Sequence, residues 1–214
     1  MASEIKIRPF LRGRFHEAAF FYGLGASTLL VAVAHESTAR WAAIIYGLCL
    51  AGLFGISSLY HRIDWQPKRY ALLKRLDHAM IFIFIAGTVT PICLVGLPQE
   101  TGMKVLALFW GAALLGVCKE LLWLKAPKWV SAILYVAMGW LAGPFISEFL
   151  SALGPLSTWL LIIGGVIYTL GAIIYAIKWP NPRPTIFGYH EIFHILVMIA
   201  SVFHFIVIYR LIAA

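Results

Sequence analysis

The chain has 214 residues, of which 62% are hydrophobic and 12% are charged, and its mean hydropathy is +0.88. Soluble domains carry about 25% charged residues, so this composition excludes an ordinary soluble enzyme and indicates an integral membrane protein. The formal net charge of +8 comes from Lys and Arg residues that lie between apolar runs. That pattern is typical of topology signals, and we therefore do not expect nucleic acid as a partner.

Seven apolar runs are long enough to cross the roughly 30 Å of hydrocarbon in a bilayer. They lie near residues 18–35, 40–61, 77–97, 103–123, 128–147, 156–178 and 189–212. Proline or glycine occurs in most of the links between them, which is typical of turns. The sequence therefore predicts an all-α bundle of seven transmembrane helices, with residues 1–17 as a basic N-terminal segment and residues 18–214 as a single membrane domain.

The basic residues predict how the bundle is oriented. Fourteen of the 17 Lys and Arg residues lie in the N-terminal segment and in the links after the second, fourth and sixth runs. The other side has only Arg40, Lys104 and Arg210. Because positive residues accumulate on the cytoplasmic side, we predict a cytoplasmic N-terminus and an external C-terminus in a multi-pass protein of the inner or plasma membrane.

Three histidines at the ends of two apolar runs form the candidate site. His190 and His194 are four residues apart at the start of the last run, so their imidazoles share one helix face. The predicted topology places both at the same depth as His61, which closes the second run. Ionisable groups in a span usually face a protein interior, a cavity or a metal. Since zinc accepts neutral imidazoles, we predict a Zn2+ site between these three residues.

Two oxygen-bearing side chains accompany the histidines. Ser57 lies four residues before His61 on the same helix face, where its hydroxyl can bond water or substrate. Asp77 opens the third run at the same depth and can orient a ligand, hold water or act as a general base. The structural alternatives are a helix N-cap for Asp77 and simple helix packing for Ser57.

The last run also contains a second pattern, His190-Glu191-Ile192-Phe193-His194. It matches the HExxH of soluble zinc proteases, in which the glutamate is the base. The membrane context and the third histidine favour the three-histidine site instead. His204 lies about 15 Å deeper than His194 and cannot share its metal. Packing against a neighbouring helix and a role in a proton path or lipid pocket are both open for His204.

Four motifs occur in order along most of the chain: Ser57-x-x-x-His61, Leu76-Asp77-His78, Ala86-Gly87-Thr88-Val89-Thr90-Pro91, and His190-x-x-x-His194 followed by His204. Together they resemble the hemolysin III family, the bacterial branch of the progestin and adiponectin receptor superfamily. The resemblance implies a seven-helix fold with zinc near the cytoplasmic face, held by His61, His190 and His194. It also implies that Asp77 holds the water at the metal and that Ser57 lies beside it.

The first helix departs from the family pattern. After Glu17 the chain reads Ala18-Ala19-Phe20-Phe21, without the Asn and His that often follow the acidic residue in the family. This departure concerns a polar role for the first helix and does not affect the predicted zinc site.

Two functions fit these residues. One is an intramembrane hydrolase of a lipid amide or ester, ceramidase-like chemistry that the superfamily resemblance implies, with a membrane lipid as substrate and Asp77 taking the proton from zinc-activated water. The other is a non-enzymatic sensor or regulator of membrane state, whose zinc is structural. A channel or haemolysin ranks last. A fourth coordination position that holds water favours the hydrolase, whereas a closed coordination shell with no acyl-sized cavity favours the regulator. The sequence names no protein partner.

Overall fold

The computed structural model of the chain describes residues 9–123 and 126–214. Within these ranges the regular structure is helical, and no β-strand occurs, although one isolated bridge pairs Arg183 with Phe187. The all-α prediction is confirmed. Lys6, Arg8 and Lys125, which entered the prediction of orientation, lie outside the described ranges.

The described chain forms the following α-helices in order: α1 (Arg14–Val33), α2 (Ser37–Arg62), α3 (Pro67–Pro91), α4 (Gln99–Leu122), α5 (Lys128–Gly139), α6 (Ile146–Ile177) and α7 (Tyr189–Ile212). A π-helix, Ile92–Gly96, continues α3, and a 3-10 segment, Trp140–Phe145, joins α5 to α6. Six stretches of the described chain are long and apolar enough to span a membrane, and Trp129–Ile177 counts as one of them. A multi-pass membrane protein is thus confirmed, whereas seven crossings and their orientation stay predictions.

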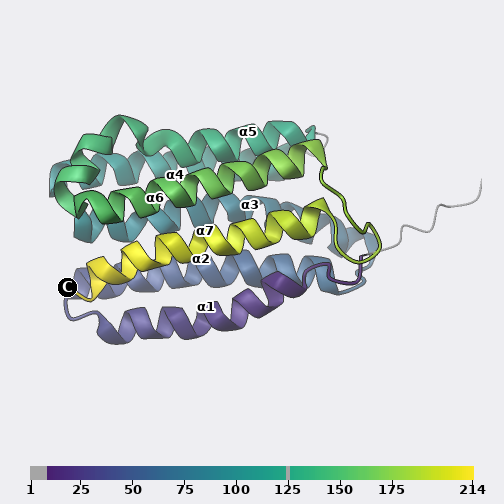
Figure 1. Cartoon of the computed structure of the whole chain (residues 1–214), viewed down its shortest axis with the longest axis horizontal. Helices are drawn as coiled ribbons and strands as arrows, with labels where there is room; N and C mark the ends of the chain where they lie inside the picture. The colour runs from purple at the N-terminus through teal and green to yellow at the C-terminus, as the bar shows by residue number, and fades with distance from the viewer. Residues whose placement is uncertain (1–8, 124–125) are drawn as a thin grey trace, which may run out of the picture.

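The helices lie side by side along the long axis of the molecule (Figure 1). α2 packs against α1 and α3, α4 packs against α3, and α7 packs against α6. One end of the bundle holds the start of α1, the end of α2 and the start of α7, whereas the C-terminus lies at the opposite end (Figure 1). Small residues allow neighbouring helices to approach each other closely. A Cβ added to Gly116 of α4 would lie 2.3 Å from the Phe82 ring of α3.

The α3 helix begins at Pro67, well before the start that hydropathy predicts near residue 77. Proline is favoured in the first turn because its missing N–H would have had no partner there. Residues 68–75, which carry four Lys and Arg side chains, are mostly good helix formers. Hydropathy measures apolarity and not helix propensity, so it did not predict the first turns of α3 before residue 77. Asp77 consequently lies inside α3, and the alternative that it caps the helix is wrong.

The chain reverses direction near Gly154. This residue has φ 75° and ψ 168°, a left-handed conformation that glycine adopts without strain, and it interrupts the helical geometry of α6. Nε1 of Trp140, before the interruption, donates to Oγ1 of Thr169, after it, at 3.0 Å. The segments on either side of Gly154 therefore lie alongside each other, as the predicted link at Gly154-Pro155 requires.

Candidate metal centre

Three histidines from two helices meet at one end of the bundle. His61 lies in the last turn of α2, and His190 and His194 lie in the first two turns of α7. One nitrogen of each ring lies within 4.8 Å of the others, and the Nε2 atoms of His61 and His190 are 3.1 Å apart. All three side chains are buried. The structure thus brings together the three histidines that the sequence selected.

This set of nitrogens fits a tetrahedral metal ion. Two imidazole nitrogens bound to one tetrahedral zinc at about 2.0–2.1 Å lie about 3.3 Å from each other. The 3.1 Å between His61 and His190 is close to that separation. In addition, Nδ1 of His194 is buried and makes no hydrogen bond within the described chain. Three imidazoles gathered in this way are suited to a cation.

Asp77 and Ser57 lie beside the three histidines. Oδ2 of Asp77 is 3.8 Å from Nε2 of His61. Ser57 lies one turn before His61 on α2, and its Oγ is 2.9 Å from Nδ1 of His16. Both side chains are buried, and both line the cavity described below. The structure places them where their predicted roles require, and the roles themselves stay predictions.

His16 of α1 also belongs to this cluster, although the sequence analysis did not select it. Its ring is buried and stacks on the ring of His194, with centroids 3.7 Å apart and planes 7° apart. The first helix does therefore contribute a polar group here, from the residue before Glu17 and not after it. A lone histidine carries no periodic signal. However, the depth argument that joined His61 to His190 applies equally to His16 and could have found it.

Glu191, the glutamate of the HExxH-like run, points away from the histidines. Its side chain is fully buried. Oε1 accepts a hydrogen bond from Nε of Arg12, and Oε2 accepts one from the backbone N–H of Gly188 at 2.8 Å. Both carboxylate oxygens are thus engaged at the start of α7. This geometry argues against Glu191 as a catalytic base and supports the three-histidine interpretation.

A cavity of about 200 Å³ extends from the histidine cluster between α3, α5, α6 and α7. Its wall is mainly apolar and includes Phe84, Ile85 and Val136. Gly139 and Gly143 also line it, and a Cβ added to either would meet no packed neighbour within 4 Å in the described chain. The histidine cluster therefore occupies the polar end of an apolar cavity.

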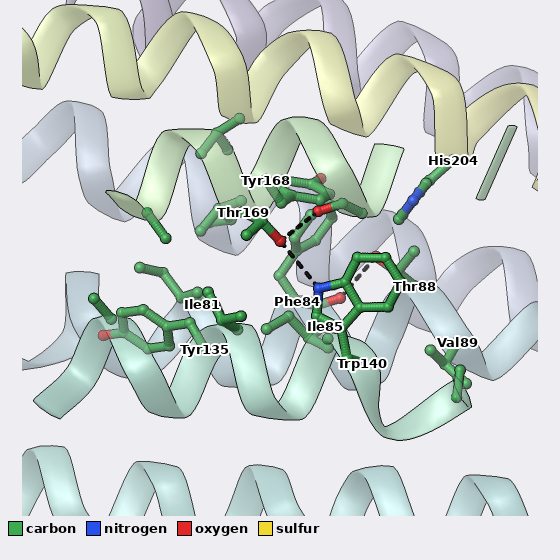
Figure 2. A pocket seen from close by; sticks show the side chains of 18 of the residues that line it. Ile81, Phe84, Ile85, Thr88, Val89, Tyr135, Trp140, Tyr168, Thr169 and His204 are labelled. Carbon is green, nitrogen blue, oxygen red and sulfur yellow. Dashed lines mark hydrogen bonds between the residues drawn. The ribbon is translucent and has the colours of Figure 1, made fainter. Parts of the chain in front are cut away.

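Other polar side chains that line the cavity include Thr88, Trp140, Thr169 and His204 (Figure 2). The hydrogen bond from the Trp140 indole to Thr169 crosses from the 3-10 segment to α6 and is drawn in Figure 2. Nε2 of His204 lies 3.1 Å from the carbonyl oxygen of Leu161. This bond agrees with the interpretation of His204 as a histidine packed against a neighbouring helix.

A second buried polar cluster joins α3, α4 and α5. The carboxylate of Glu120 accepts hydrogen bonds from Nζ of Lys119 at 2.8 Å and from Oγ of Ser131 at 2.7 Å, and it lies 3.6 Å from Nδ1 of His78. The Tyr135 hydroxyl donates to the carbonyl oxygen of His78 at 3.2 Å. His78 follows no ligand spacing and was not among the predicted metal ligands. The structure pairs this residue with Glu120 instead.

The fold and the site define an all-helical membrane protein with a three-histidine cluster at the polar end of an apolar cavity. The sequence matches the family described as "Haemolysin-III related" over residues 5–205, and the chain belongs to that family.

The relatives agree with this assignment. "Hemolysin-3" of Bacillus cereus is 32% identical over 166 residues, which cover 73% of this chain and 75% of that protein. The "Hemolysin-3 homolog" of Bacillus subtilis (strain 168) is 29% identical over 166 residues, covering 76% and 78% respectively. "Monocyte to macrophage differentiation factor" of Homo sapiens is 23% identical over 188 residues, covering 86% and 76%. This human relative supports the link to the progestin and adiponectin receptor superfamily.

Proposed function

We propose that the chain is an intramembrane hydrolase that cleaves a lipid amide or ester with zinc held by His61, His190 and His194. The observation that carries the proposal is the cluster of three imidazoles beside Asp77, of which His190, His194 and Asp77 line the polar end of an apolar cavity. An apolar cavity suits an acyl chain, and the polar end suits the carbonyl group that is attached to it. Bound zinc would polarise that carbonyl and lower the pKa of water toward about 7.

The remaining residues have defined roles in this proposal. Asp77, whose carboxylate oxygen is 3.8 Å from His61, takes a proton from the attacking water. Ser57 presents its hydroxyl to the substrate carbonyl or to the water. The apolar wall holds the acyl chain and excludes bulk water from the reacting groups.

The proposal includes a topology of seven crossings, with a cytoplasmic N-terminus, an external C-terminus and a place in the inner or plasma membrane. The reversal near Gly154 supports seven crossings, because it divides the long segment Trp129–Ile177 into two limbs that lie alongside each other. In this topology the histidine cluster lies near the cytoplasmic face, and a lipid reaches the cavity from the bilayer.

The test compares the purified wild type with a His190→Ala/His194→Ala double variant. We expect one zinc per chain in the wild type and none in the double variant, together with fatty acid release from N-acyl or ester lipids by the wild type alone. His35→Ala is the control, because His35 is exposed in the link between α1 and α2. Zinc without hydrolysis would favour the membrane regulator with a structural metal. A wild type without metal would contradict the proposal.

A further inference from the structure

A short stretch before and at the start of α1, residues 9–16, contacts the elements that carry the three histidines. We call this stretch the N-terminal turn. The backbone N–H of Phe10 donates to the carbonyl oxygen of Thr185 at 3.0 Å, and that of Leu11 donates to Ile186 at 3.1 Å. The Phe15 ring contacts the Phe187 ring edge-on, at 6.2 Å between centroids. The N-terminal turn is thus attached to the link that leads into α7.

Arg12 of the N-terminal turn holds the first turn of α7. Its guanidinium pairs with Glu191, which lies between His190 and His194 in sequence and is fully buried. The same carboxylate accepts the N–H of Gly188, so it connects Arg12 to the beginning of α7. A buried carboxylate is strongly unfavourable without a partner, and loss of Arg12 therefore disturbs this helix start. The two histidines of α7 depend on that start for their position.

Gly13 packs directly against the third histidine. Its φ of 78° is in the left-handed region, which favours glycine. A Cβ at this position would lie 2.7 Å from Cβ of His61, closer than two carbon atoms can approach. The absence of a side chain thus lets the backbone of the N-terminal turn lie against His61.

His16 completes the set of contacts. Its stacking on His194, described above, fixes the plane of that ring, and its bond to Ser57 connects the ring to α2. Arg12, Gly13 and His16 therefore touch Glu191, His61 and His194 respectively. The five residues 12–16 thus contact both α2 and α7, the helices that carry the three histidines.

We propose that the N-terminal turn positions the three histidines and that its docking is coupled to metal binding. Arg12, Gly13 and His16 are positioning residues in this inference, which rests on the metal site of the proposed function. Metal binding selects the arrangement in which the three nitrogens converge, and that arrangement contains the docked turn. The coupling is reciprocal, so bound metal stabilises docking by the same factor by which docking raises metal affinity.

The first test is a titration of the metal-free, detergent-purified full chain with Co2+ and then Zn2+. Arg12→Ala is expected to lower the affinity by about 10–100-fold, as loss of residues that orient ligands commonly does. Arg14→Ala is the matched control, because Arg14 is exposed and its side chain bonds the Phe10 carbonyl within the same turn. We expect it to change affinity less than about twofold. Equal affinities for the two variants would overturn the inference.

A second test uses the wild type alone, so it does not depend on the folding of a variant. Hydrogen exchange of residues 10–16 is measured with and without Zn2+, and exchange of the α4 amides serves as the internal reference. We expect zinc to slow exchange in the N-terminal turn. An unchanged rate there, with zinc bound, would contradict coupling.

These tests separate the inference from the proposed function. A chain that binds metal and shows the coupling but hydrolyses no lipid would retain the inference and lose the enzyme. If the chain hydrolyses lipid but Arg12→Ala leaves metal affinity unchanged, the proposed function is retained and the inference is lost. A chain that binds neither Co2+ nor Zn2+ would overturn both.

Discussion

The bundle contains two polar clusters, one around Glu120 and one around the three histidines. They differ in whether their members include groups of opposite charge. In the cluster on α3, α4 and α5, the Glu120 carboxylate meets the Lys119 ammonium, the Ser131 hydroxyl and the His78 ring. In the cluster on α2 and α7, three imidazoles converge, with two of their nitrogens 3.1 Å apart. The first cluster has partners of opposite polarity within itself. The second gathers like groups and is suited to an added cation.

Consecutive residues of α3 serve the two clusters. Asp77 faces His61, whereas His78 faces Glu120. Successive side chains on a helix point about 100° apart, so one helix can serve both clusters without mixing them. The comparison therefore predicts that substitutions at the two clusters have separable effects, one on metal binding and the other on stability.

The largest expected effect is the loss of metal from the histidine cluster. His194→Ala should lower zinc affinity by more than about a hundredfold, because even the loss of a group that only orients a ligand costs about 10–100-fold. Competition with a chromophoric chelator measures it. Glu120→Ala should keep the wild-type affinity, and an equal loss in both variants would remove the distinction between the clusters.

Asp77→Asn is expected to retain zinc and to lower the rate of lipid hydrolysis by about 10²–10⁴-fold, the usual contribution of a general base. The amide keeps the size of the side chain but cannot accept the proton. Rates at saturating lipid, with metal content measured on the same samples, test this. An unchanged rate would remove Asp77 from the mechanism.

Glu120→Ala should destabilise the protein by about 2–4 kcal/mol, because it leaves the half-buried Lys119 ammonium without its carboxylate partner. Reversible unfolding in detergent, compared with the wild type, gives this value. A Lys119→Met/Glu120→Leu variant is the control and should recover most of the loss, since it removes both charges together. If that variant is as unstable as Glu120→Ala, loss of packing and not an unpaired charge explains the effect.

The smallest expected effect separates two serines. Ser131→Ala removes the hydrogen bond to Glu120 and the one from Lys119, and should cost about 1–2 kcal/mol of stability with no change in zinc affinity. Ser57→Ala removes the bond to His16 and should instead reduce hydrolysis. Stability and lipid hydrolysis are measured on both variants. A loss of hydrolysis in Ser131→Ala, or a loss of stability alone in Ser57→Ala, would contradict these roles.

The spacing of two histidines and the depth of a third sufficed to select three side chains that the structure brings together. The four-residue spacing of His190 and His194 is a local property, and the depth of His61 follows from counting apolar runs. The start of α3 at Pro67 was missed because the first turns of that helix are polar. His16 was missed because a single residue has no period, although its depth, like that of His61, follows from counting apolar runs.

The Glu120 cluster could not be found in the sequence for a different reason. Its members come from three helices, and the pairing of His78 with Glu120 depends on which helices are neighbours. Hydropathy and spacing define the length of a helix and the faces it presents, but they do not define the lateral order of helices in a bundle. For the same reason, the sequence did not predict the contact between Arg12, near the start of the chain, and Glu191 in the last helix.

Two glycines of the cavity wall affect how long a lipid acyl chain the cavity could hold in the proposed function. Gly139 and Gly143 are one helical turn apart, and neither would bring a new Cβ into contact with a packed neighbour within 4 Å among the described residues. Both glycines are exposed and line the cavity, so larger side chains at these positions can be accommodated without displacing a helix. In the proposed hydrolase, the sizes of these two side chains would then limit the length of the acyl chain that is cleaved, while the surrounding bundle stays the same.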